Sequence, residues 1–334
     1  MPASAYNKRL HWFLVFVACC TFVLLAAGGL VTSNNAGLAV PDWPDSFGHL
    51  PLSPAYFTKV RMVSGVLFEH GHRIIAQFVG LLAIVAGVWL WKAEKRSWMR
   101  KLGWSALGLV IVQGIFGGIT VLYKTPPLVS SIHAALAQTF FAVTVLMAVF
   151  TGTKWLSAEV TPRQESAHVG MRRLTLLLLA LLYLQLMTGA AFRHVWTKLG
   201  PDGSREFTPH YIVTHFFSLH IANMVLLVAV ILWIAGYALR EFGDLPAVRR
   251  PALLLLVLLQ AQFGLGFFAY LTRVEWRDDL VQPTLPLVAM TVLHLLTGAL
   301  MLATAAVLTV QSYRYVPAEN SEAATSAARK ASIA

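Results

Sequence analysis

The feature that most constrains the fold of this chain is a series of long apolar segments. A helix needs about 20 mainly apolar residues to cross the hydrocarbon layer of a membrane. Eight segments reach or approach that length: 11–31, 70–91, 103–123, 129–150, 173–192, 213–238, 251–271 and 286–310. Of all residues 57% are hydrophobic and 12% are charged, whereas soluble domains are about 25% charged. We therefore expect an all-α membrane protein with eight transmembrane helices in a lipid bilayer.

The basic residues indicate how these segments are oriented. Loops on the cytoplasmic side of a membrane carry an excess of lysine and arginine. Such residues collect at five places, which fall on one side if every segment crosses once: Lys8 with Arg9, 92–101, 154–173, 240–250 and Arg314. Both termini are therefore expected in the cytoplasm, with the protein in the inner (plasma) membrane. Orientation also explains the net charge of +11, so we expect no nucleic-acid partner.

The eight segments look like two copies of a four-helix unit. Similar short sequences occur in the same order in both halves: HRIIAQF (72–78) and HIANMVL (220–226), VQGIFGG (112–118) and AQFGLGF (261–267), IHAALAQ (132–138) and LHLLTGA (293–299). A shared order of weak matches is typical of an internal repeat. We predict an N-terminal bundle in residues 1–160, a C-terminal bundle in residues 161–316, and a disordered tail in residues 317–334.

The repeat places one histidine in each even-numbered segment: His72, His133, His220 and His294. All four fall toward the external face, and ionisable groups at membrane depth mark functional sites. Two histidines on neighbouring helices of one bundle can face each other, which suits the two axial positions of a haem iron. Two alternatives stay open. The histidines bond across helices or to backbone groups, or His215 replaces His220 as a ligand.

The two halves differ beside the first of these histidines. Glu69 lies three residues before His72 and therefore on the same helix face, and Arg73 follows His72 directly. The matching positions of the second half hold Phe217 and Ile221. A haem that only passes electrons needs no acid nearby, so we infer that the first half holds the reactive site and the second half a resident cofactor.

Two roles are open to this charged pair. Glu69 can exchange protons or stabilise positive charge that develops on a substrate, and Arg73 can pair with a haem propionate. The alternative is that Glu69 and Arg73 neutralise each other at the start of the helix.

These motifs resemble those of the haem A synthase family. GLAVPDWPDSFGHLP (37–51) is similar to the first external loop of that family, and EHGHRIIA (69–76) is similar to its second-helix motif. One histidine in each later even-numbered helix completes the pattern. The resemblance covers roughly residues 10–310. It implies a fold of eight helices in two four-helix bundles related by a pseudo-twofold axis.

The resemblance also implies a reaction. The family oxidises one ring methyl of haem O to a formyl by successive hydroxylations that use molecular oxygen, and the product is haem A for terminal oxidases. By position, His72 and His133 would hold the substrate haem, His220 and His294 would hold haem b, and Glu69 would be the catalytic carboxylate. Implied partners are a haem O synthase as substrate donor, an electron donor that the sequence does not identify, and assembly factors of terminal oxidases.

Two other functions are compatible with a bundle of this kind. A di-haem membrane cytochrome b that exchanges electrons with quinol would need the four histidines but no reactive carboxylate, so Glu69 argues against it. A transporter built from repeats would have polar groups and interrupted helices near the midplane, whereas the polar groups here lie near one surface. The connection 32–69 has no cysteine, although many bacterial relatives carry a cysteine pair there.

Overall fold

Eight helices of the described chain are long and apolar enough to cross a membrane. The computed structural model describes residues 6–157, 170–195, 197–199, 205–207, 210–272 and 283–316. The long helices are α1 (Lys8–Ser33), α3 (Ser64–Ala93), α4 (Ser97–Leu122), α5 (Pro127–Thr151), α7 (Met171–Val195), α8 (His210–Glu241), α9 (Pro246–Tyr270) and α10 (Leu285–Tyr315). The prediction of an all-α protein with eight membrane-spanning helices is confirmed.

The remaining described elements are short and lie in connections. They are the helices α2 (Pro54–Thr58) and α6 (Thr153–Leu156) and the strands β1 (Thr197–Leu199) and β2 (Arg205–Phe207). The two strands pair antiparallel between α7 and α8. The predicted disordered tail, 317–334, lies outside the described residues.

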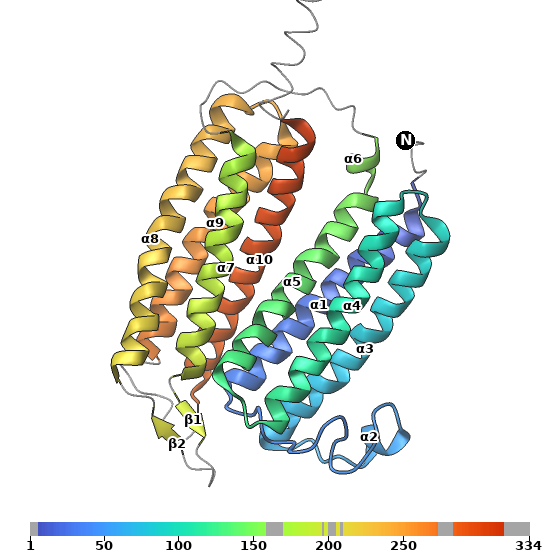
Figure 1. The fold of residues 1–334 in the computed structure, drawn as a ribbon, viewed down its shortest axis with the longest axis vertical. Coiled ribbons are helices and arrows are strands. Elements are labelled where there is room, and N and C mark those ends of the chain that lie inside the picture. Colours follow the sequence, from blue (N-terminus) through green and yellow to red (C-terminus); the bar gives the residue numbers. More distant parts are fainter. Residues whose placement is uncertain are drawn as a thin grey trace, which may run out of the picture.

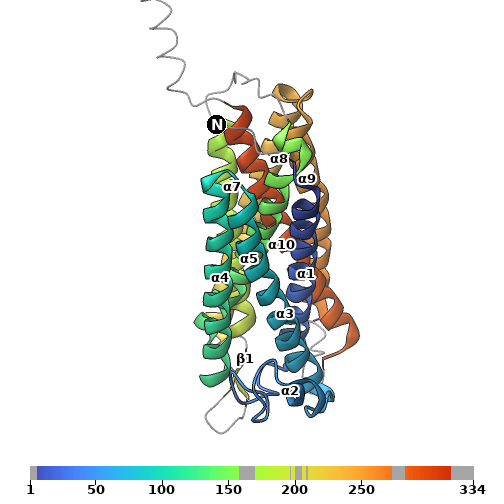
Figure 2. The ribbon, with the colours of Figure 1, turned by 90° about the vertical axis from the view of Figure 1, so that its right-hand side faces the viewer.

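The long helices form two groups of four, which stand side by side in Figure 1. In the first group α1 and α4 each contact both α3 and α5, and in the second group α7 and α9 each contact both α8 and α10. Contacts of α5 with α7, of α5 with α10 and of α1 with α10 join the groups. Figure 2 shows the same helices running roughly parallel to the long axis. The order of neighbours is the same in both groups, while the pseudo-twofold axis and the domain boundaries stay predictions.

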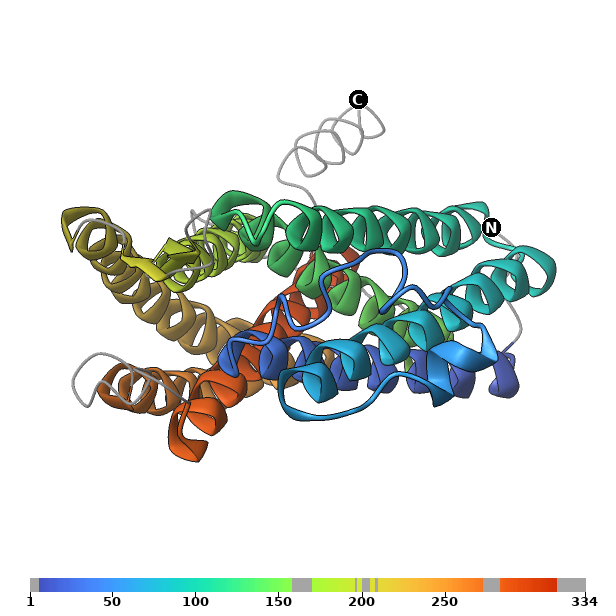
Figure 3. The same ribbon diagram turned by 90° about the horizontal axis from the view of Figure 1, so that it is seen from below.

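The chain begins in α1 and leaves α10 at the same end of the molecule, at the top of Figure 1. We call this the terminal end. The opposite end is the loop end, where α1 finishes at Ser33 and α3 begins at Ser64. The connection between them, residues 34–63, lies across the loop end of the first bundle, as the view from below in Figure 3 shows.

The apolar core of each bundle lies toward the terminal end. In the first bundle it includes Leu14 early in α1 and Leu90 late in α3. In the second it includes Leu178 in the first half of α7 and Leu308 late in α10. Helices in a membrane are held together by such close packing rather than by exclusion of water. The halves near the loop end, where the four histidines lie, therefore contribute little to these two clusters.

Several spanning helices begin earlier than predicted: α4 begins at Ser97 rather than residue 103, α9 at Pro246 rather than residue 251, and α3 differs by a similar amount. The sequence placed the start of the second spanning segment at residue 70, but α3 begins at Ser64. Val66, Leu67 and Phe68 extend the apolar helix surface by more than a turn. Glu69 therefore lies inside the helix, away from the free N–H groups of its first turn.

Candidate functional site

Each of the four histidines packs its ring against a glycine on the preceding helix of its bundle. The pairs are Gly28 with His72, Gly117 with His133, Gly189 with His220, and Gly266 with His294. In every pair Cε1 of the imidazole is the atom nearest to the glycine, and a β-carbon placed on the glycine would lie 2.8–3.2 Å from it. Real β-carbons are rarely so close to another atom, so each glycine lets the ring lie flat against the helix.

Three of the four rings also bond to a glutamine located one helical turn before the glycine. Nδ1 of His133, His220 and His294 lies 3.2, 3.1 and 3.2 Å from the carbonyl oxygens of Gln113, Gln185 and Gln262, respectively. The side-chain amide nitrogens of these glutamines lie 3.4, 3.1 and 3.2 Å from Nε2 of the same rings. The sequence Gln-x-x-x-Gly therefore occurs in α4, α7 and α9, and the histidine that it contacts lies in the helix that follows each of them.

These contacts determine which ring nitrogen carries the proton. A carbonyl oxygen can only accept a hydrogen bond, and an amide nitrogen can only donate one. Nδ1 therefore carries the hydrogen, and Nε2 presents its lone pair. This is the tautomer that a histidine needs to bind a metal through Nε2.

The ring of His220 has the most extensive support. The side chain of Asn223 donates to the side-chain oxygen of Gln185 at 2.7 Å and to the carbonyl of Leu181 at 2.9 Å. These bonds hold the Gln185 amide so that its nitrogen points at His220. The Thr188 hydroxyl lies 3.3 Å from Nδ1 of the same ring.

His72 is the exception among the four. The residue four positions before Gly28 is Leu24 rather than glutamine. The Leu24 carbonyl faces the ring, but the contact does not reach hydrogen-bond geometry. Nδ1 of His72 is buried without a hydrogen-bond partner among the described residues.

The histidines of one bundle face each other. The ring centres of His220 and His294 are 6.4 Å apart with an interplanar angle of 64°. His72 and His133 are close enough to interact electrostatically. His215, the predicted alternative to His220, is exposed and its recorded ring contact is with Phe216. No cluster of three or more metal-binding side chains occurs in the part of the chain that the structure describes.

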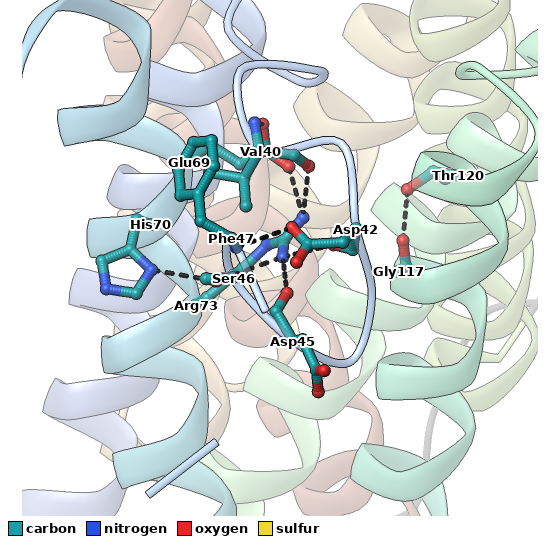
Figure 4. Close-up of polar contacts among 10 residues, drawn as sticks. All are labelled: Val40, Asp42, Asp45, Ser46, Phe47, Glu69, His70, Arg73, Gly117 and Thr120. Atoms are coloured by element: carbon teal, nitrogen blue, oxygen red, sulfur yellow. Dashed lines mark hydrogen bonds and ion pairs between the residues drawn. The ribbon is translucent and has the colours of Figure 1, made fainter. Parts of the chain in front are cut away.

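Glu69 and Arg73 form a buried ion pair at the loop end of α3 (Figure 4). Glu69 is 4% exposed. One carboxylate oxygen accepts a hydrogen bond from Nη2 of Arg73 at 2.7 Å, and the other accepts one from the backbone N–H of Val40 at 2.8 Å. A buried charge needs such partners, and the predicted neutralisation of Glu69 by Arg73 therefore has a direct geometric basis.

Arg73 also holds the connection 34–63 in place. Its guanidinium donates to the carbonyl oxygens of Asp42 at 2.7 Å, Asp45 at 2.8 Å and Val40 at 2.9 Å. All of its recorded hydrogen bonds go to this connection or to Glu69. The role predicted for Arg73 at a haem propionate stays a prediction.

Asp42 and His70 stabilise the same connection, and sequence reasoning missed both. The carboxylate of Asp42 accepts the backbone N–H groups of Phe47 at 2.9 Å and Gly48 at 2.8 Å. Burial by itself raises the pKa of Asp42, but the N–H groups of Gly48 and Phe47 and the charge of Arg73 outweigh it, so the pKa is lower than usual. The buried ring of His70 lies 3.1 Å from the Ser46 hydroxyl and 2.9 Å from the Tyr56 carbonyl.

The connection reaches across to α4 as well. A β-carbon on Gly118 would lie 2.5 Å from the indole ring of Trp43, so this glycine leaves the space in which the ring packs. The neighbouring Gly117, also on α4, packs against the ring of His133 from α5. Residues 34–63 therefore reach across the loop end of the first bundle from α3, which carries His72, to α4.

Comparison with known proteins decides the family. Residues 11–281 match the family described as "Cytochrome oxidase assembly protein". The chain belongs to this family. Two relatives named "Heme A synthase", from Alkalihalophilus pseudofirmus and Lysinibacillus sphaericus, are each 24% identical over 80% and 81% of this chain and 89% and 88% of their own length. A third of that name, from Exiguobacterium sibiricum, is 29% identical over 57% of this chain and 61% of its own.

These matches confirm the predicted resemblance to the haem A synthase family. With eight spanning helices, the family member described here is an integral membrane protein. The cluster of ionisable residues at 69–73 has two faces. His72 points into the bundle against Gly28, whereas Glu69, His70 and Arg73 contact the connection 34–63.

The contact between Gly266 and His294 leads to a prediction with a control on the same helix. Gly266→Ala places a methyl group 2.8 Å from the imidazole. Overpacking of this kind costs about 1–3 kcal/mol, so retention of a haem bound through His294 should weaken roughly tenfold. Gly264 lies on the opposite face and has no atom within 4 Å of an added β-carbon. Haem content per purified protein should fall for Gly266→Ala alone; equal content in both variants would contradict the contact.

The bonds of Arg73 predict how residues 34–63 respond to Arg73→Lys. Lysine keeps the charge but lacks the planar fork that reaches several carbonyls. One hydrogen bond to a charged group contributes about 1.5–3 kcal/mol, so the connection should open at least tenfold more often. Trypsin cleavage after the exposed Lys59 and Arg61, followed by mass spectrometry, measures this opening. Arg100→Lys at the terminal end is the control, and an unchanged cleavage rate would show that Arg73 does not clamp the connection.

Proposed function

We propose that this protein is a haem A synthase, a membrane enzyme that oxidises a methyl group of haem O to a formyl by successive oxygen-dependent hydroxylations. The observation that carries the proposal is the repeated unit of glycine and inward-facing histidine, present twice in each bundle of a chain whose relatives are named for this reaction. A bound haem would supply the chemistry that activates oxygen. The protein supplies ligands, orientation and a sealed site.

Several features of the described residues fit a haem in each bundle. Metal–imidazole bonds are about 2 Å long, so ring centres 6.4 Å apart, as in His220 and His294, are spaced as two imidazole ligands of one metal atom would be. The side-chain oxygens of Gln113 and Gln262 are buried without a partner among the described residues. Such atoms are costly unless a ligand or water satisfies them.

The two bundles have different roles in this proposal. His72 and His133 bind the iron of the substrate haem O, and His220 and His294 bind the iron of a resident haem b. The bond of His220 Nδ1 to the Gln185 carbonyl holds the ring while Nε2 is free to bind iron, which suits a cofactor that stays in place and passes electrons.

Glu69 is the proposed catalytic carboxylate. It lies one helical turn from His72, and both of its oxygens are held, one by Arg73 and one by the Val40 N–H. A carboxylate fixed in this way keeps its position while positive charge develops on a substrate, or holds a proton at a defined oxygen. The connection 34–63 covers Glu69, which is buried and bonded to Val40 of this connection. Arg73 therefore positions the carboxylate and the cover together.

The protein lies in the inner (plasma) membrane with both termini in the cytoplasm and the haem sites toward the external face. A haem O synthase delivers the substrate, an unidentified donor supplies electrons, and the product passes to terminal oxidases and their assembly factors. The arrangement of basic residues supports this orientation.

A second candidate function is a di-haem cytochrome b that exchanges electrons with quinol and leaves both haems unchanged. It is favoured by the equal glycine and histidine geometry of the two bundles. Glu69, which has no counterpart in the second bundle, distinguishes the two candidates, because only the enzyme needs it.

Replacing Glu69 tests the enzyme. Glu69→Gln keeps the shape and an oxygen that accepts from Arg73 but removes the negative charge. Loss of a charged group in the transition state lowers turnover by about 10²–10³-fold. In cells that make haem O, haem A in extracted pigment should fall by this order while haem b content stays the same. Glu94→Gln is the control, since Glu94 is also buried and bonds to Arg96 at the other end of the helix. Haem A formation that survives Glu69→Gln would refute the catalytic role.

Replacing His294 tests the resident cofactor. His294→Ala removes one of two ligands of the proposed haem b, and the purified protein should lose most of its haem b absorbance. His215→Ala, on an exposed histidine of α8, should retain it. Unchanged haem b content in His294→Ala would reject the ligand role.

A further inference from the structure

Basic and aromatic side chains gather at the terminal end of the first bundle, where α3 turns into α4 (Figure 1). We call residues 91–104 the first hairpin. We propose that the first hairpin binds the headgroup of an anionic phospholipid of the surrounding bilayer. The site lies at the opposite end of α3 from Glu69 and His72, so it includes none of the residues proposed for haem binding or catalysis.

Most of the positive charge of the first hairpin is not neutralised by the described chain. Residues 91–104 contain five basic residues and one carboxylate. The two oxygens of that carboxylate, Glu94, accept hydrogen bonds from Nε and Nη2 of Arg96 at 3.0 and 2.7 Å. The four remaining cations form no ion pair with a described residue: Lys92, Lys95, Arg100 and Lys101. A ligand with negative charge would therefore complement this surface.

Aromatic rings lie beside these cations. Cζ of Arg100 is 5.9 Å from the centre of the Trp91 ring, and the rings of Trp91 and Trp104 are centred 6.0 Å apart. Both tryptophans are exposed, and tryptophan is enriched where membrane helices meet the headgroup layer. Arg100 and Lys101 precede Trp104 by four and three residues and so share its face of α4. Cations and rings therefore form one surface.

Close packing of α3 against α4 holds this surface in shape. A β-carbon on Gly103 would lie 2.9 Å from the Leu90 side chain, and one on Gly87 would lie 3.7 Å from the Gly103 carbonyl. Such small residues let two helices approach closely in a membrane. The turn is tied to α5 as well, because Arg96 donates to the carbonyl of Phe150 at 3.0 Å. A surface held in this way loses less conformational entropy when it binds a ligand.

The corresponding hairpin of the second bundle, residues 239–252 between α8 and α9, lacks these features. It contains three arginines, two carboxylates and no tryptophan. Arg249 donates to the carbonyl of Gly243 in the same turn at 2.6 Å. Orientation of the chain by basic residues does not require this difference between the hairpins. Anionic lipids of the cytoplasmic leaflet attract lysine and arginine near the membrane surface, and they match the charge of the first hairpin.

Native mass spectrometry of the full chain can compare two phospholipids with the same acyl chains. Phosphatidylglycerol is negatively charged, whereas phosphatidylcholine has no net charge. Each basic residue near such a charge strengthens binding about fivefold, so the wild type should bind its first phosphatidylglycerol at least roughly tenfold more tightly than phosphatidylcholine. Arg100→Gln combined with Lys101→Gln should reduce this preference by about 20-fold or abolish it.

The matched control removes the same charge from the second hairpin. Arg240→Gln combined with Arg250→Gln replaces two exposed arginines and should leave the preference as in the wild type. Arg100→Lys keeps the charge but loses the planar group that lies over Trp91, so the preference should fall only about two- to fivefold. In phosphatidylcholine all variants should unfold at the wild-type temperature, which shows that the fold is retained.

Two results would overturn the proposal. If the wild type binds both phospholipids equally, the first hairpin is not an anionic lipid site, and an acidic partner protein becomes the better occupant. If both double variants lose the preference to the same extent, the lipid responds to the overall charge of the terminal end rather than to the first hairpin.

Discussion

The structure depends on an imidazole ring that lies flat on a helical glycine. This contact brings two helices together at a fixed depth, and it occurs in four helix pairs: α1 with α3, α4 with α5, α7 with α8, and α9 with α10. A larger residue at the glycine would push the ring away, and a missing bond at Nδ1 would leave it free to turn. Where glutamine precedes the glycine by four residues, one helix supplies the surface for the ring and the carbonyl that accepts from Nδ1, and this bond selects the histidine tautomer.

A second constraint is the cost of burying charge near the membrane surface. Glu69 and Arg73 are tolerated because they bind each other and because backbone groups of Val40, Asp42 and Asp45 form hydrogen bonds with them. Removing one partner of such a pair leaves the other buried and unpaired, which is strongly destabilising. The ion pair and the fold of the connection therefore depend on each other, and neither is formed by local sequence preference alone.

Much of the fold was predictable from composition and hydropathy, because eight apolar segments in a bilayer can hardly become anything but helices. The four histidines were also found, since the repeat marks them by position. Gln113 and Gln262 lie in the aligned segments and Gln185 lies outside them, but the role of all three depends on the pairing of helices, which hydropathy does not specify. The contacts of His70 and Asp42 were beyond prediction, because they join a helix to an irregular connection through side chains far apart in sequence. The start of α3 was misplaced because Ser64 and Gly65 are poor helix formers, and the tertiary contacts of Gly65 with Ala39 and Ala36 outweigh that weak preference.

Helix α3 makes functional contacts on two of its faces. Its inner face presents His72 to the bundle, and its outer face holds the cover through Glu69, His70 and Arg73. A rotation of α3 about its own axis would therefore move the His72 imidazole and the connection 34–63 together. A substitution that shifts α3 is therefore expected to change both the orientation of His72 and the position of the connection 34–63 over the bundle.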